Sequence, residues 1–250
     1  MGSSTRRVAD YNDPRFNYKK YWQKRQYGHE AEKLVLKRFF KQIPKKNSLL
    51  DIGGGFGRLT PFYAPLFKKT VLIDRSQRLL KKAKKLEKEF PHFEAKKGLA
   101  TNLPLKNNSF DVTLMIRTIH HLASIGKAFK EVRRVLKPGG FFILEFANKT
   151  HFKAILKAYL TLNLYSLTSH TPIEKSDEVI FLNLHPQVIR SLLFKNGFKI
   201  IKAVSVSNFR NTFLRKILPL RILIFLENIA QTILPAYTSG PSVFILAQKN

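Results

Sequence analysis

Three glycines and two aspartates in the first half of the chain have the types and spacing of a ligand-binding turn. Gly53, Gly55 and Gly57 follow a short apolar segment that contains Asp51. Glycine permits a tight turn and lets the backbone approach a ligand closely. Asp74 ends the next apolar segment, where a carboxylate can accept hydrogen bonds from both hydroxyls of a ribose. A glycine-rich turn alone also fits a purely structural connection, but together with Asp74 it predicts an adenosine-containing cofactor.

The glycine spacing separates two classes of such cofactors. A dinucleotide fingerprint has the form G-x-G-x-x-G, which places a pyrophosphate on a helix N-terminus. In this chain the third glycine, Gly57, comes one residue early, and Arg58 stands where the fingerprint has glycine. The resulting G-x-G-x-G form resembles that of class I S-adenosylmethionine-dependent methyltransferases.

Further motifs of the type 11 branch of that family follow in order. They are Leu-Ala-Thr-Asn-Leu-Pro-Leu at 99–105, Ser-Phe-Asp-Val at 109–112, Ile-His-His-Leu at 119–122, and Glu131-Val132 followed by Leu-Lys-Pro-Gly-Gly at 136–140. The resemblance covers about residues 48–146. It implies a Rossmann-like, seven-stranded and mostly parallel sheet, S-adenosylmethionine as the cofactor, and methyl transfer as the reaction.

The resemblance also implies which residues bind the cofactor. Asp51 would face its amino group beside the glycines, Asp74 its ribose hydroxyls, and the backbone of Ala100 its adenine ring. The family usually has aspartate where this chain has Leu99, so adenine recognition would depend on backbone and apolar contacts and could be weaker. The predicted cofactor-binding residues are Asp51, Gly53, Gly55, Gly57, Asp74, Leu99, Ala100, Arg117 and Arg25.

Two arginines and a histidine have less specific support. Arg117 follows a predicted strand and lies where the family lines the methionine and acceptor region. Segment 21–27 resembles an N-terminal segment that closes over the cofactor in some relatives, so Arg25 could reach the cofactor carboxylate; a surface helix with aromatic anchors fits this segment equally well. His121 is the candidate general base, required only if the acceptor must lose a proton. Packing or a helix start is the alternative for His120 and His121.

The elements that position these residues alternate between strands and helices. Apolar runs predict strands at 49–52, 70–74, 111–115, 141–146, 198–206 and 242–247. Helical spacing predicts helices at 30–40, 78–90, 125–136, 186–194 and 213–234, with Pro138-Gly139-Gly140 stopping the third. Such alternation implies an α/β fold with a parallel sheet and helices on both faces.

The chain divides into three parts of one domain. Residues 1–47 form an N-terminal helical segment that closes over the cofactor, 48–146 the cofactor-binding core, and 147–250 an inserted helical cap on the acceptor side and the last strands. The insertion at 147–197 would cover the acceptor above the strand ends, with Tyr159, Tyr165 and Phe181 as candidates for an apolar pocket. Segment 209–225 mixes basic and apolar residues, which fits an anionic membrane surface or a helix packed on the sheet with its basic residues outward.

Composition limits the classes of function. The chain has 250 residues, of which 44% are hydrophobic and 24% charged, and this excludes a collagen-like or mainly disordered protein. It has no cysteine, so disulfides, zinc–thiolate sites and cysteine nucleophiles are excluded; its histidines lack metal-ligand spacing, so no metal is expected. The net charge of +29 predicts salt-dependent binding to nucleic acid or anionic membranes, unless it reflects only a lysine-rich composition.

The sequence therefore favours one function and leaves two others open. The favoured one is an S-adenosylmethionine-dependent methyltransferase that moves a methyl group to a small-molecule or lipid-like acceptor by in-line displacement. The alternatives are an RNA methyltransferase on the same fold, or a non-catalytic protein that binds an adenosine ligand or nucleic acid. With no evident signal peptide or spanning helix, we expect a cytoplasmic protein that could lie at the membrane periphery.

Overall fold

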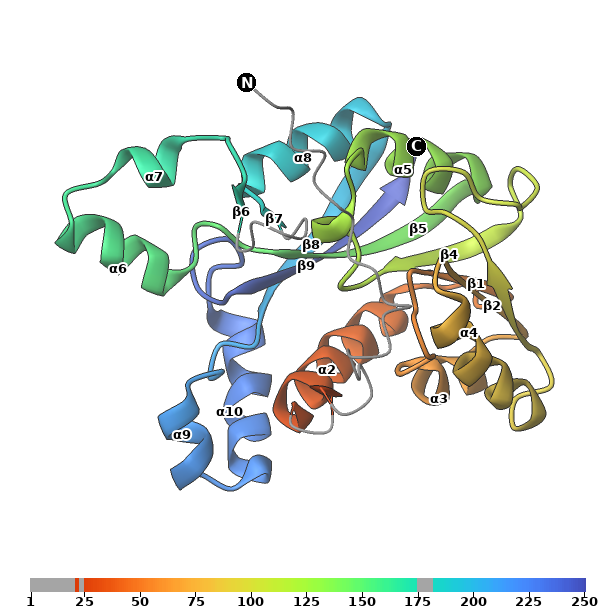
Figure 1. The fold of residues 1–250 in the computed structure, drawn as a ribbon, viewed down its shortest axis with the longest axis horizontal. Helices are drawn as coiled ribbons and strands as arrows, with labels where there is room; N and C mark the ends of the chain where they lie inside the picture. Colours follow the sequence, from red (N-terminus) through yellow and green to blue (C-terminus); the bar gives the residue numbers. More distant parts are fainter. Residues whose placement is uncertain (1–20, 23–24, 175–181) are drawn as a thin grey trace.

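Seven strands form one mostly parallel sheet, as predicted. The computed structural model describes residues 21–22, 25–174 and 182–250 (Figure 1). The order of the strands is β3-β2-β1-β4-β5-β9-β8, and only β9 runs antiparallel to its neighbours. The strands are β1 (Ser48–Ile52), β2 (Lys69–Asp74), β3 (Phe93–Lys97), β4 (Phe110–Met115), β5 (Leu136–Ala147), β8 (Phe198–Val206) and β9 (Ser242–Lys249).

Helices cover both faces of the sheet because neighbouring strand residues point to opposite sides. Leu49 of β1 packs with α2 (Gln26–Gln42) and α3 (Thr60–Tyr63), whereas Leu50 packs with α5 (Ile125–Val135) and α8 (Pro186–Lys195). Helix α4 (Gln77–Ala83) packs against β2 and β3. The last helix, α10 (Leu220–Ile233), lies against α2 and β8. The described residues therefore form three layers, with helices packed on each face of the sheet and an apolar core on either side of it.

Several predicted boundaries differ from the structure. The helix predicted over 125–136 ends at Val135, and Pro138-Gly139-Gly140 does not stop it but lies inside β5. Pairing of β5 with β4 shifts register between Phe110 and Val112, which accommodates the irregular Pro-Gly-Gly segment. The helix predicted over 78–90 is the α-helix α4 followed directly by a 3₁₀ helix, η2 (Lys84–Lys88).

One strand of the sheet was not predicted. In β3 only Phe93 and Ala95 are buried, and the other three residues are charged. The strand forms the edge of the sheet, where one solvent-exposed side tolerates such residues. Its apolar signal is therefore too short to distinguish it from a loop.

The helical region predicted over 213–234 is two helices. Leu218 and Pro219 separate α9 (Thr212–Ile217) from α10, because proline disfavours helical geometry in the residue before it. Neither these helices nor any other helix among the described residues is both long and apolar enough to cross a membrane.

The predicted insertion leaves the sheet at the end of β5. It contains α6 (Phe152–Leu160), α7 (Tyr165–Thr168) and the short strands β6 (Ile173–Glu174) and β7 (Leu182–Asn183). Lys149, just after β5, is buried, and its ammonium donates to the carbonyls of Ser169 and Thr171 at 2.7 and 2.8 Å. These two bonds hold the segment after α7 close to the end of β5. Tyr159 and Tyr165 are exposed, so the prediction that they line an apolar pocket is wrong. Phe181 lies outside the described residues.

Candidate functional site

The glycine turn begins directly after β1. Gly53, Gly55 and Gly57 have φ values of +74°, +60° and +78°, which side chains other than hydrogen strongly disfavour. A Cβ atom on Gly53 would lie 2.4 Å from Oγ1 of Thr118. Thr118 follows β4, and its hydroxyl donates to the Ile52 carbonyl at 3.1 Å. The absence of a side chain at Gly53 therefore lets the turns after β1 and β4 meet.

Asp74 lies at the end of β2 and holds this turn in place. Its Oδ2 accepts the Gly55 N–H at 2.9 Å and its Oδ1 accepts the Ser76 N–H at 2.8 Å. Burial raises the pKa of this carboxyl above its usual value, although N–H bonds from Ser76, Gly55 and Arg75 and the charge of Arg75 oppose the shift. A carboxylate has two oxygens with about four lone-pair sites, so beside these N–H donors it retains acceptor capacity for a ribose hydroxyl.

Asp51 is a second buried carboxyl beside the same turn. Among the described residues, the Tyr63 hydroxyl donates to its Oδ2 at 3.0 Å, and no other side chain or backbone N–H is bonded to it. Burial raises the pKa of Asp51 to about 7; nearby Asp74 adds to the shift, while the Tyr63 bond and Arg58 oppose it. A buried carboxyl with so few donors suits a cationic partner such as an ammonium group.

The turn that follows β3 reaches the same place. Gly98 N–H donates to the Asp74 carbonyl at 3.1 Å, and Asn102 N–H donates to the Leu99 carbonyl at 3.0 Å. Leu99 is 51% exposed, and Ala100 packs partly against the core. An exposed leucine here offers apolar surface for a planar ring, as expected for the adenine side of the predicted cofactor.

The structure thus brings the predicted Asp51, Asp74, glycine turn and Leu99–Ala100 together at the carboxyl edge of the parallel strands. The set fits the predicted cofactor: a buried carboxyl for an ammonium, a second for ribose hydroxyls, and an apolar turn for a base. These assignments stay predictions at the level of single residues.

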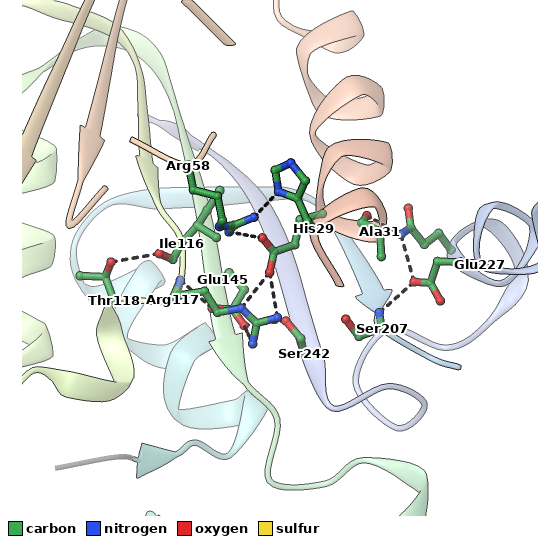
Figure 2. Close-up of polar contacts among 12 residues, drawn as sticks. His29, Ala31, Arg58, Ile116, Arg117, Thr118, Glu145, Ser207, Glu227 and Ser242 are labelled. Atoms are coloured by element: carbon green, nitrogen blue, oxygen red, sulfur yellow. Dashed lines mark hydrogen bonds and ion pairs between the residues drawn. The ribbon is translucent and has the colours of Figure 1, made fainter. Parts of the chain in front are cut away.

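Figure 2 shows a buried ion cluster that sequence reasoning did not find. The Glu32 side chain of α2 is fully buried, and its two oxygens each meet one guanidinium. Arg117 reaches Oε1 through Nε and Nη2, both at 2.8 Å, while Arg58 binds Oε2. The Arg58 guanidinium also lies 3.6 Å from the centre of the Trp22 ring. These two cations hold the pKa of Glu32 below its usual value despite its burial.

The cluster continues from Arg117 to the centre of the sheet. Arg117 has a φ of +58°; its backbone N–H donates to Oε2 of Glu145 at 2.9 Å, and its Nη1 lies 3.6 Å from Oε1. The Ser242 hydroxyl donates to the same Oε1 at 2.6 Å. The Arg117 guanidinium is therefore held between two buried carboxylates, and its predicted contact with the cofactor stays a prediction.

A sequence signal for this cluster existed. Glu32 lies between Ala31 and Val35 on the apolar face of its helix, and Glu145 interrupts the apolar strand 141–146. A charged residue on an apolar face is rarely buried without a partner. The partners, Arg58 and Arg117, were not identifiable because they are far from Glu32 in sequence.

Arg25 and His121 lie near these groups. Arg25 directly precedes α2, with its guanidinium 4.0 Å from the centre of the Tyr21 ring. Arg25 and Arg117 lie close enough to Arg210 to contribute to lowering its pKa, after burial. His121 lies in η3 (Ile119–His121), the turn that Thr118 ties to β1. Contact of Arg25 with the cofactor and general-base catalysis by His121 stay predictions.

The comparisons with known proteins agree with this arrangement. Residues 50–144 match the family described as "Methyltransferase domain". An uncharacterized methyltransferase YcgJ of Bacillus subtilis is 30% identical over 117 residues, which are 46% of each chain. A ubiquinone/menaquinone biosynthesis C-methyltransferase UbiE of Rickettsia typhi is 34% identical over 156 residues, 58% of this chain and 60% of that one. The chain thus spans about half the length of the curated relatives it matches.

Solved structures share the fold over most of the chain. A possible histamine N-methyltransferase of Thermotoga maritima superposes with a TM-score of 0.61 at 23% identity, covering 93% of this chain and 94% of that one. The YcgJ protein of B. subtilis gives a TM-score of 0.58 at 18% identity, covering 88% and 98%. At these identities the likeness supports the fold alone. In the part of the chain that the structure describes, no three histidine or acidic side chains form a metal-binding group.

Proposed function

We propose that this chain, whose residues 50–144 belong to the type 11 branch of class I S-adenosylmethionine-dependent methyltransferases, transfers a methyl group to a small-molecule or lipid-like acceptor. The observation that carries the proposal is the pair of buried carboxyls, Asp51 and Asp74, on either side of a glycine turn at the ends of β1 and β2.

Each residue of the site has a defined part in this proposal. Asp74 accepts the ribose hydroxyls, Asp51 neutralises the amino group, and the Leu99–Ala100 turn covers the adenine. S-adenosylmethionine supplies a methyl group activated by a sulfonium, so the protein mainly has to align the acceptor and exclude water. His121 would take a proton where the acceptor must lose one.

Two observations support a lipid-like acceptor. The UbiE relatives act, as their name states, as C-methyltransferases in ubiquinone and menaquinone biosynthesis. In this chain the helices that follow β5 and β8 expose large apolar side chains. An apolar acceptor would find a compatible surface there.

Calorimetry on the full chain tests the cofactor. We expect S-adenosylmethionine and S-adenosylhomocysteine to bind with micromolar affinity and NAD, the control, not to bind. Transfer of a labelled methyl group to an isoprenoid quinone precursor but not to RNA would support the proposed acceptor class. Binding of the cofactor without transfer to any acceptor would favour the non-catalytic alternative, and absence of binding would contradict the proposal.

The pH dependence of cofactor affinity tests Asp51. Its pKa of about 7 means that the carboxyl is largely protonated at pH 6, and an ammonium ligand requires the ionised form. Affinity should therefore rise with pH, by roughly tenfold between pH 6 and 8. Asp51→Asn should bind more weakly and without this dependence. If the variant keeps the full pH dependence, another group, such as a histidine, is responsible.

A further inference from the structure

The outward face of α10 is apolar. Ile222, Phe225, Ile229 and Ile233 recur at helical spacing and are exposed. Phe225 and Ile233 are the most exposed of the four, at 64% and 70%. The opposite face is buried, and its Glu227 accepts the Tyr27 hydroxyl at 2.6 Å and the Ser207 N–H at 2.8 Å. Leu223 and Ala230 are buried on the same side as Glu227. The helix therefore has apolar residues on its buried face and, unlike an ordinary surface helix, also on its solvent face.

Two further helices, α9 and α6, repeat this feature. In α9 no residue is buried, and Phe213 and Ile217 are exposed. In α6 the exposed side chains again share one helical face. They are Phe152, Leu156, Tyr159 and Leu160. Exposed apolar surface of this extent marks an interaction site.

The charges beside these faces are of one sign. Segments 150–168 and 209–235 contain one acidic residue, the buried Glu227. Lys153 and Lys157 flank the apolar face of α6 and are exposed. Beside α10, a groove against α2 combines apolar and cationic side chains. It is lined by Leu34, Lys37, Arg38, Lys41, Arg221, Ile224, Phe225 and Asn228.

Both helical segments leave the same edge of the sheet. Segment α6–α7 follows Ala147 at the end of β5, and α9–α10 connects Val206 of β8 to Ser242 of β9. Ser242 is paired in register with both Ala147 and Val206, so these three strand ends are adjacent. In Figure 1 both segments project from the same end of the molecule. The glycine turn follows β1, which is parallel to β4 and, through it, to β5, so the candidate site lies on this edge as well.

From these observations we propose that α6, α9 and α10 dock the chain on an anionic lipid bilayer. The apolar side chains enter the acyl boundary, and the lysines and arginines contact anionic headgroups. The exclusively cationic flanks favour this occupant over a second copy of the chain, whose equal charge would repel it. Docking would turn the candidate site toward the membrane; the conclusion that its acceptor is drawn from lipid rests on the proposed function, whereas the docking itself does not.

Sedimentation of the full chain with vesicles tests the proposal without cofactor, so its failure is distinct from a failure of cofactor binding. We expect binding to phosphatidylcholine vesicles that contain about 30% phosphatidylglycerol and little binding to phosphatidylcholine alone. The triple variant Phe213→Ser, Phe225→Ser, Ile233→Ser should lose at least about tenfold in partitioning, because each residue removes apolar burial in the bilayer. Phe194→Ser is a single-residue control for loss of an exposed phenylalanine away from this face, since Phe194 lies near the start of β8, at the other edge of the sheet.

A second set of variants tests whether binding depends on the cations near α10 or on the net positive charge of the whole chain. Lys37→Gln, Lys41→Gln, Arg221→Gln should weaken binding at least about tenfold, since each cation near an anionic surface contributes severalfold. Lys81→Gln, Lys84→Gln, Lys88→Gln removes as many exposed cations at α4 and η2 and should have a smaller effect. Circular dichroism and urea midpoints verify that the variants are folded.

Three outcomes would overturn the proposal. The first is equal binding to neutral and anionic vesicles. The second is vesicle binding by the triple serine variant that matches the unmodified chain. The third is a lipid-independent dimer that the serine substitutions dissociate, without vesicle binding, which would make this face an interface between copies.

Discussion

Replacing Asp74 by alanine should lower the affinity for S-adenosylmethionine by about a hundredfold or more. A hydrogen bond to a charged group contributes roughly 1.5–3 kcal/mol, and the carboxylate is expected to accept two from the ribose. Their combined loss corresponds to a factor of at least about 10². The substitution also removes the acceptors of the Gly55 and Ser76 N–H groups, so the glycine turn would lose part of its support.

Asp111→Ala is the control for this experiment. Asp111 is also a carboxylate with structural bonds: it accepts the Ser48 N–H and hydroxyl and the Lys137 ammonium, each at 2.9 Å. It lies near the start of β4, at the edge away from the glycine turn. Titration calorimetry should show near-normal affinity for Asp111→Ala despite lower stability. Normal affinity in Asp74→Ala would refute the ribose assignment, and equal losses in both variants would indicate a general weakening of the sheet.

The sequence predicted the centre of the fold because its strands carry strong local signals. Segments such as 49–52 and 111–115 are continuous apolar runs, typical of strands buried on both faces. The edge strand β3 lacked this signal because solvent covers one of its sides. The prediction for the Pro-Gly-Gly segment was wrong because such a segment usually ends a helix. Here strand β4 pairs with Leu136 and Phe141 on either side of it, so the segment becomes part of β5.

The sequence predicts those parts of the site that depend on sheet topology. It does not predict the ion pairs between residues that lie far apart in the chain. Asp51 and Asp74 were expected to be adjacent because parallel strands end at one edge. The Glu32 cluster joins residues from α2, the glycine turn and β5, and no local pattern states which cation meets which carboxylate. In the same way, helical spacing identifies the residues that share a face of α10, but only tertiary structure shows that the face with Glu227 is buried and the face with Phe225 is exposed.

Glu32→Gln should have the largest effect on stability. The substitution leaves the guanidinium groups of Arg58 and Arg117 without their shared carboxylate, and removing one partner of a buried ion pair costs about 3–5 kcal/mol. Glu30→Gln is the matched control two residues earlier in α2, where the partly exposed carboxylate pairs with Lys33 at 2.9 Å. The loss of stability in this variant should not exceed about 0.5 kcal/mol. Urea unfolding measures both free energies.

The pH dependence of stability distinguishes a contribution from the Glu32 ion pairs from a contribution of side-chain packing. Because the folded-state pKa of Glu32 lies below the unfolded value, its carboxylate stabilises the fold fully above about pH 4.5. This contribution is lost as the pH falls through the folded-state pKa. The difference in stability between the unmodified chain and Glu32→Gln should therefore shrink below about pH 4.5. A difference that stays constant with pH would mean that the side chain acts through its shape, and that α2 is held to the sheet by its apolar face alone.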